Sequence, residues 1–277
     1  KNGIVVRGSG NSYADQAING DGAVMMTGHL DSIRSFDSET GELVCEPGVT
    51  LRAITELFAP RGFMLPTATA SGQHTLGGAI AANIVGVNGH RRTSLARSVN
   101  WIEVLLADGS AVRASETENT ELFKAVVGGQ GLIGIIIQIS ITLLKRPADN
   151  VVVERRRMAN LNELTEALKS ARKTSDFCCA WLDTSARADA VGRGVLMTAS
   201  FTRDSATVPL FSAPKWKPPL PHFFLRLAST PFVKRLRYRL SPADGKTVEP
   251  YEKFLYPSDS VRYFTHRGVY QFQASFP

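Results

Sequence analysis

The alternation of apolar and polar residues predicts short strands and helices that mix without regular βαβ repeats. Apolar runs predict a strand that starts at Ile4 and further strands over residues 23–27, 33–37 and 43–46. Thr50 is then expected to cap a helix. The apolar face of this helix is predicted to consist of Leu51, Ile54, Leu57 and Phe58. The pattern as a whole predicts an α+β fold.

The next segment reads as a hairpin, a short helix and a long strand. Strands over 101–107 and 111–114 flank the turn Asp108-Gly109. Ser115-x-x-Glu118 has the form of a capping box for the helix. The long strand is predicted to place on one face a set of alternating residues: Ile135, Ile137, Ile139, Ile141 and Leu143.

The character of the chain changes near Arg146-Pro147-Ala148, which predicts one domain over residues 1–147 and a second over 148–277. The second domain is expected to begin with a strand over 151–157 and a helix after Asn160. Its inward side chains are predicted to be Leu161, Leu164 and Leu168. A strand over 195–201 precedes a proline-rich stretch, 208–221, which cannot form regular structure.

Three glycine-rich segments carry the candidate chemistry. The first, residues 7–15, follows the first strand and can form an anion-binding nest, because its glycines let consecutive N–H groups point inward. An ordinary Gly/Ser turn is the alternative. The second, 69–89, is nearly free of charge and lets backbone approach a large flat group, although close helix packing explains it equally well. The third is residues 127–134.

Taken in order, these segments resemble the flavoproteins of the vanillyl-alcohol oxidase family, which bind FAD in a PCMH-type domain. The resemblance is greatest to decaprenylphosphoryl-ribose 2-oxidases and their bacterial relatives. The motifs that carry it are Arg7-Gly-x-Gly-x-Ser12-Tyr13-x-Asp15, Thr75-x-Gly77-Gly78-Ala79-Ile80-Ala81, Leu105-x-Ala107-Asp108-Gly109, Glu121-Leu122-Phe123, Gly128-Gly129-x-Gly131-Leu132-x-Gly134-Ile135-Ile136, Ala180-Trp181-Leu182-Asp183, Gly192-Arg193-Gly194, Phe254-Leu255-Tyr256-Pro257-x-Asp259 and Tyr270-Gln271-Phe272-Gln273. The resemblance implies an FAD domain of two α+β subdomains, then a substrate domain with an antiparallel sheet, incomplete at its C-terminus.

The resemblance also implies which residues bind FAD and substrate. The expected FAD-binding residues are Arg7, Gly8, Ser9, Gly10, Asn11, Ser12, Tyr13, Ala70, Ser71, Thr75, Leu76, Gly77, Gly78, Ala82, Asn83, Gly86, Gly131 and Ile136. A sugar pocket is expected to be lined by Trp181, Gln271 and Gln273. For Trp181 a core aromatic is an equal alternative, and for the two glutamines an alternating strand face.

The departures from the family pattern change the expectations. Asn11 stands where many relatives attach FAD through histidine, so the FAD is expected to be non-covalent. Val85-Gly86-Val87-Asn88 replaces a His-Gly-Lys-Asn sequence, which removes an imidazole and an ammonium group from beside the flavin. The lysine that serves as base or substrate-positioning group in the relatives is expected beyond Pro277. We therefore interpret the sequence as a fragment and leave the catalytic base unassigned.

Charge adds a membrane surface to the expected partners. The formal net charge is +7, and cations and aromatic residues gather between Phe223 and Arg239. Such a segment suits an anionic membrane surface, and a solvated basic helix is the alternative. No nucleic-acid-binding fold accompanies it, so no nucleic acid is expected. Cys45, Cys178 and Cys179 have no metal-ligand spacing, so no metal is expected. Their odd number and single vicinal pair predict reduced thiols in a reducing compartment. With the basic segment, this predicts a cytoplasmic protein at the periphery of a membrane.

The resemblance implies an FAD-dependent oxidoreductase. The expected reaction is oxidation of a secondary hydroxyl of a polyprenyl-phosphate-linked sugar to a ketone, with a partner reductase. Two alternatives stay open. One is an oxidase of a small alditol or aldonolactone, and the other is a catalytically degenerate protein that binds FAD without turnover.

Overall fold

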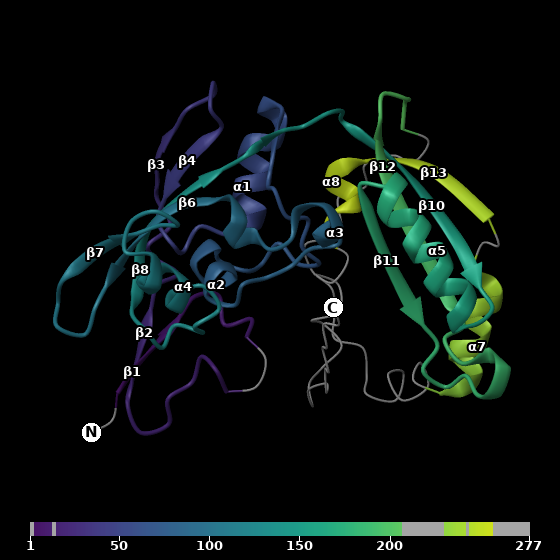
Figure 1. Ribbon diagram of the computed structural model, residues 1–277, viewed down its shortest axis with the longest axis horizontal. Coiled ribbons are helices and arrows are strands. Elements are labelled where there is room, and N and C mark those ends of the chain that lie inside the picture. Colours follow the sequence, from purple (N-terminus) through teal and green to yellow (C-terminus); the bar gives the residue numbers. More distant parts are fainter. Residues whose placement is uncertain (1–2, 13–14, 207–229, 242–243, 257–277) are drawn as a thin grey trace. The chain divides into compact units, whose positions relative to one another are not determined.

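The computed structural model of the chain describes residues 3–12, 15–206, 230–241 and 244–256 (Figure 1). It divides into two compact units. The first unit runs up to Asp149 and also contains Phe254–Tyr256, and the second begins at Asn150. The domain boundary expected after residue 147 lies close to this division.

The first unit is built on a five-stranded sheet in the order β3-β4-β8-β6-β7, in which every neighbouring pair is antiparallel. Two smaller sheets accompany it, the parallel pair β1-β2 and the antiparallel pair β5-β9. The strands are β1 Ile4–Arg7, β2 Ala23–Met26, β3 Ile33–Phe36, β4 Glu42–Cys45, β5 Phe63–Met64, β6 Val99–Leu105, β7 Ala111–Ala114, β8 Ile135–Thr142 and β9 Leu144–Lys145. The helices are α1 Leu51–Phe58, η1 Ala59–Arg61, α2 Leu76–Ala81, α3 Gly89–Arg92, η2 Leu95–Ser98 and α4 Thr120–Val126.

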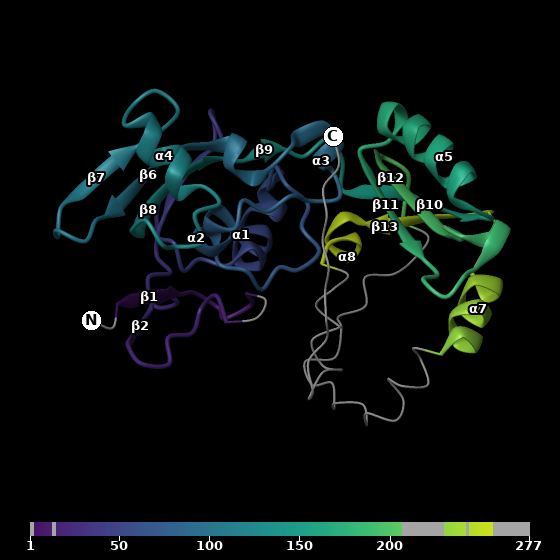
Figure 2. The ribbon, with the colours of Figure 1, turned by 60° about the horizontal axis from the view of Figure 1, so that its bottom comes forward.

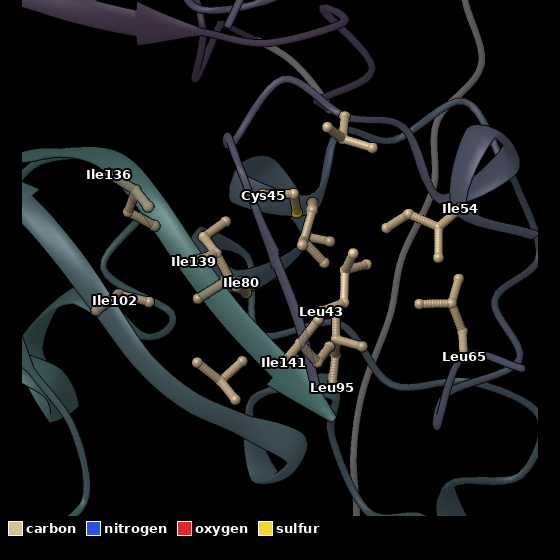
Figure 3. Close-up of a cluster of buried hydrophobic side chains, with 14 of the residues drawn as sticks. Leu43, Cys45, Ile54, Leu65, Ile80, Leu95, Ile102, Ile136, Ile139 and Ile141 are labelled. Carbon is tan, nitrogen blue, oxygen red and sulfur yellow. The ribbon is translucent and has the colours of Figure 1, made fainter. Parts of the chain in front are cut away.

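The core of the first unit lies where α1 and α2 pack against the five-stranded sheet (Figure 3). Thr50 caps α1 as expected, because its hydroxyl accepts a hydrogen bond from the Ala53 N–H at 3.1 Å. Leu51, Ile54 and Phe58 are buried as expected, but Leu57 is 40% exposed. Thr55 takes the inward position in place of Leu57, since its hydroxyl can donate to the Leu51 carbonyl.

Strand β8 departs from the simple alternation that its isoleucines predict. Its pairing with β6 shifts register, so that Gln138 lies opposite Glu103 but Ile136 lies opposite Val104. The extra residue, Ile137, forms a β-bulge, and a bulge reverses which side chains face the core. Ile136 is therefore buried with Ile139 and Ile141, whereas Ile135 and Ile137 are only half-buried.

The Ser115 motif forms a turn and not the cap of α4. The Ser115 hydroxyl accepts hydrogen bonds from the N–H groups of Thr117 and Glu118 at 3.1 and 2.9 Å. The helix begins only at Thr120, after Asn119 in a left-handed conformation with φ 49°. The predicted capping box was wrong, because the short side chain of Ser115 closes its own tight turn first.

Segment Phe254–Tyr256 returns to the first unit and joins its core. The buried Tyr256 hydroxyl donates to the Leu51 carbonyl at 3.1 Å and lies 2.5 Å from Thr55 Oγ1. The Arg52 guanidinium lies over the Tyr256 ring, 5.1 Å from its centroid. The C-terminal end of the described chain therefore packs on α1.

The second unit is a four-stranded antiparallel sheet in the order β11-β12-β10-β13, with α5 packed on it (Figure 2). An antiparallel sheet was expected here, and the α+β fold class is confirmed for both units. The elements are β10 Asn150–Met158, α5 Leu161–Thr174, β11 Phe177–Leu182, η3 Ala188–Ala190, β12 Gly194–Thr202, α7 Pro231–Leu240, β13 Asp244–Pro250 and α8 Tyr251–Phe254.

Helix α5 is capped as its sequence predicts. The Asn160 side chain accepts from the Glu163 N–H at 3.0 Å, and the Glu163 carboxylate accepts from the Ala159 N–H at 2.7 Å. Leu164 is buried and Leu168 packs against the same cluster, but Leu161 is exposed, so its predicted inward position was wrong. Leu161 lies in the first turn of α5, outside the buried cluster of Met158, Leu164 and Leu196.

Several expected features lie outside the described residues. They are Tyr13, the proline-rich stretch 208–221, the basic and aromatic residues 223–226, and Gln271 and Gln273. Within the part of the chain that is described, no helix is both long and apolar enough to cross a membrane.

The connection between β11 and β12 is held by a buried ion pair. The Arg193 guanidinium donates to Asp183 through Nε at 3.0 Å, and the Asp183 carboxylate also accepts from the Ser185 N–H at 2.9 Å. The Asp183 side chain is fully buried. Burial alone would raise the pKa of this carboxyl, but the Ser185 and Arg193 hydrogen bonds outweigh it and hold the pKa below its usual value.

We predict that Asp183→Asn destabilises the second unit by about 3 kcal/mol at neutral pH, because it leaves the Arg193 charge without its buried partner. A carboxyl with a lowered pKa stabilises the fold above its unfolded pKa of about 3.9, and this contribution is lost as the pH falls through the lower folded pKa. Denaturant unfolding at pH 7 and at pH 3 should therefore show a smaller pH effect in the variant. Asp189→Asn, at an exposed position in the same connection, is the control. Equal unfolding free energies for the two variants would contradict the prediction.

Candidate functional site

The first glycine-rich loop lies directly against the N-terminal end of α2. A Cβ atom on Gly8 would collide with the Thr75 hydroxyl, so only glycine permits this approach. The Asn11 side chain donates to the Gln73 carbonyl at 2.8 Å, which ties the far side of the loop to the same segment. The loop is thus fixed at both of its ends.

The same loop presents a cationic side chain and unpaired backbone donors. Gly10 has φ +66°, and the Arg7 guanidinium lies against it. Among the described residues, no acceptor is hydrogen-bonded to the backbone N–H groups of residues 9–12. A left-handed glycine between consecutive N–H groups is the geometry of an anion-binding nest, and a nearby guanidinium adds charge.

The two glycines of helix α2, Gly77 and Gly78, lie in different surroundings. Gly77 is buried, its N–H donates to the Pro47 carbonyl at 2.9 Å, and a Cβ atom there would lie 2.6 Å from the Pro47 Cβ. Gly77 therefore serves the packing of the protein. Gly78 is exposed, and a Cβ atom there would meet only the Thr75 hydroxyl, at 3.0 Å. Of the two glycines, Gly78 alone is exposed.

The third glycine-rich segment closes on the C-terminal end of α2. The Gly128 and Gln130 N–H groups donate to the carbonyls of Ile80 and Ala81 at 3.2 and 2.9 Å. Gly131, with φ +77°, comes close to Val6 on β1. The three glycine-rich segments, predicted from scattered parts of the sequence, therefore meet around one short helix.

The segment after α2 is held by a residue that the sequence motifs did not single out. Asn88 is buried and donates to the Pro66 carbonyl at 2.8 Å while it accepts from the Ala68 N–H at 3.0 Å. It keeps Gly86 so close to the Ala68 backbone that no Cβ would fit. The sequence alone could have indicated this role, because the side-chain amide of an asparagine can pair with a backbone N–H and a backbone carbonyl at once.

The surface around the exposed side of α2 is built of small residues. Gly78, Ala82, Asn83 and Gly128 are all exposed, and Asn83 adopts φ +46°. Val85, 59% exposed, follows on the same segment. By contrast the side chains of Leu76 and Ile136 lie in the core, so only their main chain could face a ligand. Ala70 is exposed and Ser71 half-buried in the loop that leads to α2.

A groove of about 670 Å³ opens beside Asn83, between the loop before η2 and helix α4. Its charged groups are already paired: Arg97 with Glu116 at 3.1 Å, and Lys124 with Glu121 at 3.0 Å. The groove therefore widens the accessible space next to Asn83 without adding an unpaired charge.

The thiols do not contribute a nucleophile. Burial, with the nearby Glu46 carboxylate, raises the pKa of Cys45 to about 12, and burial raises the pKa of Cys179 to about 11. Cys178 and Cys179 are neighbours on β11, where successive side chains point to opposite faces. In the described part of the chain no three His, Cys, Asp or Glu side chains gather in a way that could hold a metal ion.

Of the expected substrate residues the structure describes Trp181 alone. Trp181 lies on β11, and the Arg237 guanidinium lies over its ring, 4.6 Å from the centroid. The ring is half-buried in the second unit. Its role in a sugar pocket stays a prediction.

The first unit is similar to known FAD-binding domains. Residues 1–115 match the family model described as "FAD binding domain". The chain is 29% identical, over 99% of its length, to decaprenylphosphoryl-beta-D-ribose oxidase of Mycolicibacterium smegmatis. It is 32% identical over 54% of its length to an uncharacterised protein of Streptomyces coelicolor, and 31% identical over 46% to mitochondrial D-2-hydroxyglutarate dehydrogenase of Bos taurus.

The chain spans 63%, 41% and 25% of the lengths of these three relatives. The residues present fit FAD, because the loop at Gly10 offers an anion-binding nest with a guanidinium and the exposed side of α2 carries the small residues Gly78, Ala82 and Asn83. Both features lie within the matched region. Residues 1–115 are therefore similar to known FAD-binding domains both in sequence and in the groups that they present to a ligand.

Proposed function

We propose that the chain is part of an FAD-dependent oxidoreductase that oxidises a CH–OH group to a ketone. The observation that carries the proposal is the convergence of the three glycine-rich segments on α2, through Gly8, Gly128 and Gln130. Relatives named as an oxidase and as dehydrogenases support the reaction class. When bound, FAD supplies the chemistry by accepting a hydride from carbon.

The residues of this chain bind and orient the cofactor in this proposal. The N–H groups of residues 9–12 and the Arg7 guanidinium hold the pyrophosphate. The exposed backbone at Gly78, Ala82 and Gly128 supports the flat part of the molecule. Asn11 fixes the loop through Gln73 and has no atom that could bond covalently to the ring, so we propose non-covalent binding.

For the substrate we propose a polyprenyl-phosphate-linked sugar. The support is the similarity, along nearly the whole chain, to a protein named decaprenylphosphoryl-beta-D-ribose oxidase. Oxidation of its secondary hydroxyl requires a base that takes the hydroxyl proton as the hydride leaves the carbon. No described residue is assigned to this role. The partner reductase, the peripheral membrane location and the pocket residues Trp181, Gln271 and Gln273 stay predictions.

One observation favours a second candidate, FAD binding without turnover. Val85 is exposed beside the small-residue surface and Val87 follows it, so neither position supplies a hydrogen-bond donor or a base from its side chain. An apolar side chain here is equally compatible with an apolar substrate group. The two candidates differ in whether substrate reduces the flavin.

The role of Gly78 can be tested by two glycine variants. We predict that Gly78→Val abolishes FAD binding and leaves unfolding almost unchanged, because the new side chain lies at the exposed surface proposed to contact the cofactor and has only Thr75 Oγ1, at 3.0 Å, as a close neighbour. Gly77→Val should instead lower the free energy of unfolding by more than about 1 kcal/mol, since its side chain collides with Pro47. Flavin fluorescence titration and thermal unfolding separate the two effects. Ala53→Val, at an exposed position of α1, is the control. Stoichiometric FAD in the Gly78 variant would show that α2 only packs.

The mode of FAD attachment has a direct test. We predict that acid precipitation of the FAD-loaded protein releases all flavin into the supernatant, because Asn11 offers no site for a covalent bond. Absorbance at the flavin maximum in the two fractions measures this. Flavin fluorescence that stays with the denatured band on a gel would refute non-covalent binding.

The reaction can be tested by anaerobic mixing of the FAD-loaded protein with candidate substrates. We predict that a polyprenyl-phosphate-linked pentose bleaches the flavin absorbance, whereas an alditol, an aldonolactone and D-2-hydroxyglutarate do not. Bleaching by one of the small substrates alone would replace the proposed substrate. Bound FAD that no substrate bleaches, but that dithionite reduces, would favour binding without turnover.

A further inference from the structure

Helix α7 of the second unit packs through its basic and aromatic side chains. The Lys234 ammonium donates to the Thr184 hydroxyl at 2.9 Å, and the Arg237 guanidinium covers Trp181. The Tyr238 ring is approached by Arg193 at 5.4 Å and by Arg157 at 6.0 Å from its centroid. Polar and cationic groups thus occupy the side of the helix that a soluble protein normally makes apolar.

The opposite side of α7 is apolar and faces away from the unit. Phe232, Leu236 and Leu240 follow one another at intervals of four residues and are 74%, 41% and 74% exposed. Residues four apart lie above one another on a helix, so these side chains form one continuous stripe. We call it the α7 stripe. A stripe of three large apolar side chains in water is costly unless another surface covers it.

Cations border the α7 stripe on both sides. Arg235 and Arg239 lie along one edge and Arg237 along the other, and residues 231–240 contain no Asp or Glu. Among the described residues no carboxylate forms an ion pair with Arg235 or Arg239. Arginine stems can lie along an apolar surface while the guanidinium reaches a polar layer. The pattern is that of a helix at the interface between lipid headgroups and acyl chains.

We propose that the α7 stripe docks on a membrane that contains anionic phospholipid. Phe232, Leu236 and Leu240 enter the boundary between headgroups and acyl chains, and Arg235 and Arg239 bind the phosphates. This goes beyond the proposed reaction and does not depend on it, because the surface belongs to the second unit alone. Lys234 and Arg237 contact Thr184 and Trp181 of the same unit, so we assign the phosphate contacts to Arg235 and Arg239.

Lipid fits the α7 stripe better than a protein partner does. The stripe is one helix wide and bordered by arginines, and it is not a groove that would enclose a partner's side chains. A headgroup layer supplies many phosphates at once, so every bordering guanidinium finds a partner without a fixed register. A protein partner would need acidic groups at matching positions, and it is one of the outcomes that the experiment distinguishes.

The test is sedimentation of the whole chain, loaded with FAD, with vesicles of phosphatidylcholine alone or of equal parts phosphatidylcholine and phosphatidylglycerol. We predict binding to the anionic vesicles at low salt and weaker binding at 1 M salt, where the Debye length is about 3 Å. Arg235→Gln with Arg239→Gln should weaken binding about 25-fold, about fivefold for each arginine near the surface. Phe232→Ser with Leu240→Ser should weaken it by about 100-fold.

Matched control variants distinguish the effect of the α7 stripe from a general loss of positive charge or of exposed apolar side chains. Lys169→Gln with Lys173→Gln removes the same charge from α5 of the same unit. Leu57→Ser with Ile18→Ser removes two large apolar side chains that are 40% and 57% exposed elsewhere. Both controls should bind anionic vesicles within about twofold of the unchanged protein at low salt. FAD content and thermal unfolding, measured on every variant, show that the fold is retained.

The outcomes either support the proposal or overturn it. Loss of binding in the α7 variants, with retained binding in both controls, supports it. Equal binding of α7 variants and controls, or no binding to anionic vesicles by the unchanged protein, overturns it. An oligomer in solution that dissociates only in the α7 stripe variants, without vesicle binding, assigns the stripe to a second copy and also overturns it. A protein that binds vesicles but fails to hold FAD would contradict the proposed function and leave this inference standing.

Discussion

The first unit depends on the close approach of Gly8 to Thr75. Thr75 caps α2 through the Gly78 N–H, and at the same point it receives the loop that leaves β1. A larger side chain at position 8 would push the loop away from the helix and separate the anion-binding N–H groups from the exposed backbone of α2. The C-terminal end of the same helix receives Gly128 and Gln130. One short helix therefore sets the positions of three distant parts of the chain.

In this arrangement some glycines are required by packing within the protein, and others lie exposed at its surface. Gly77 and Gly86 are required because backbone or proline lies directly behind them, and each is satisfied by the protein itself. Gly78 and Gly128 are exposed, and a Cβ atom on either would meet a single neighbour, Thr75 Oγ1 at 3.0 Å or Asn83 Cβ at 3.4 Å. Gly128 also has φ +77°, which favours glycine by itself. Packing and ligand binding both favour glycine, so a sequence with one glycine after another does not show which duty each one has. The direction of the missing Cβ decides it, and this direction depends on which elements pack on α2.

The sequence predicted most helices and strands correctly, but for some of them it did not predict which side chains face the core. Caps at Thr50 and Asn160, the α+β class and the three glycine-rich segments follow from local chemistry, which the chain carries in adjacent residues. The bulge at Ile137 reversed the predicted face of half of β8, because a bulge is fixed by the partner strand β6 and not by β8 itself. Leu57 and Leu161 are apolar at helical spacing, yet both lie beyond the edge of the cluster that their helices bury. Asn88 was named only as the last residue of a motif, and its structural role was not predicted because its partners, Pro66 and Ala68, become neighbours only in the fold.

In the second unit, Arg193 contacts both the buried Asp183 and Tyr238 on helix α7. The Arg193 guanidinium neutralises the buried Asp183. It also lies over the Tyr238 ring, through which α7 packs against the rest of the unit. The ion pair thus fixes the connection between β11 and β12 and helps to set the rotation of α7 about its own axis. Since Lys234 and Arg237 are used on the inner side, the remaining positions of the helix, Phe232, Leu236 and Leu240, must face outward. The composition of the segment showed that it was basic and aromatic, but only these inward contacts determine which of its residues meet the surroundings.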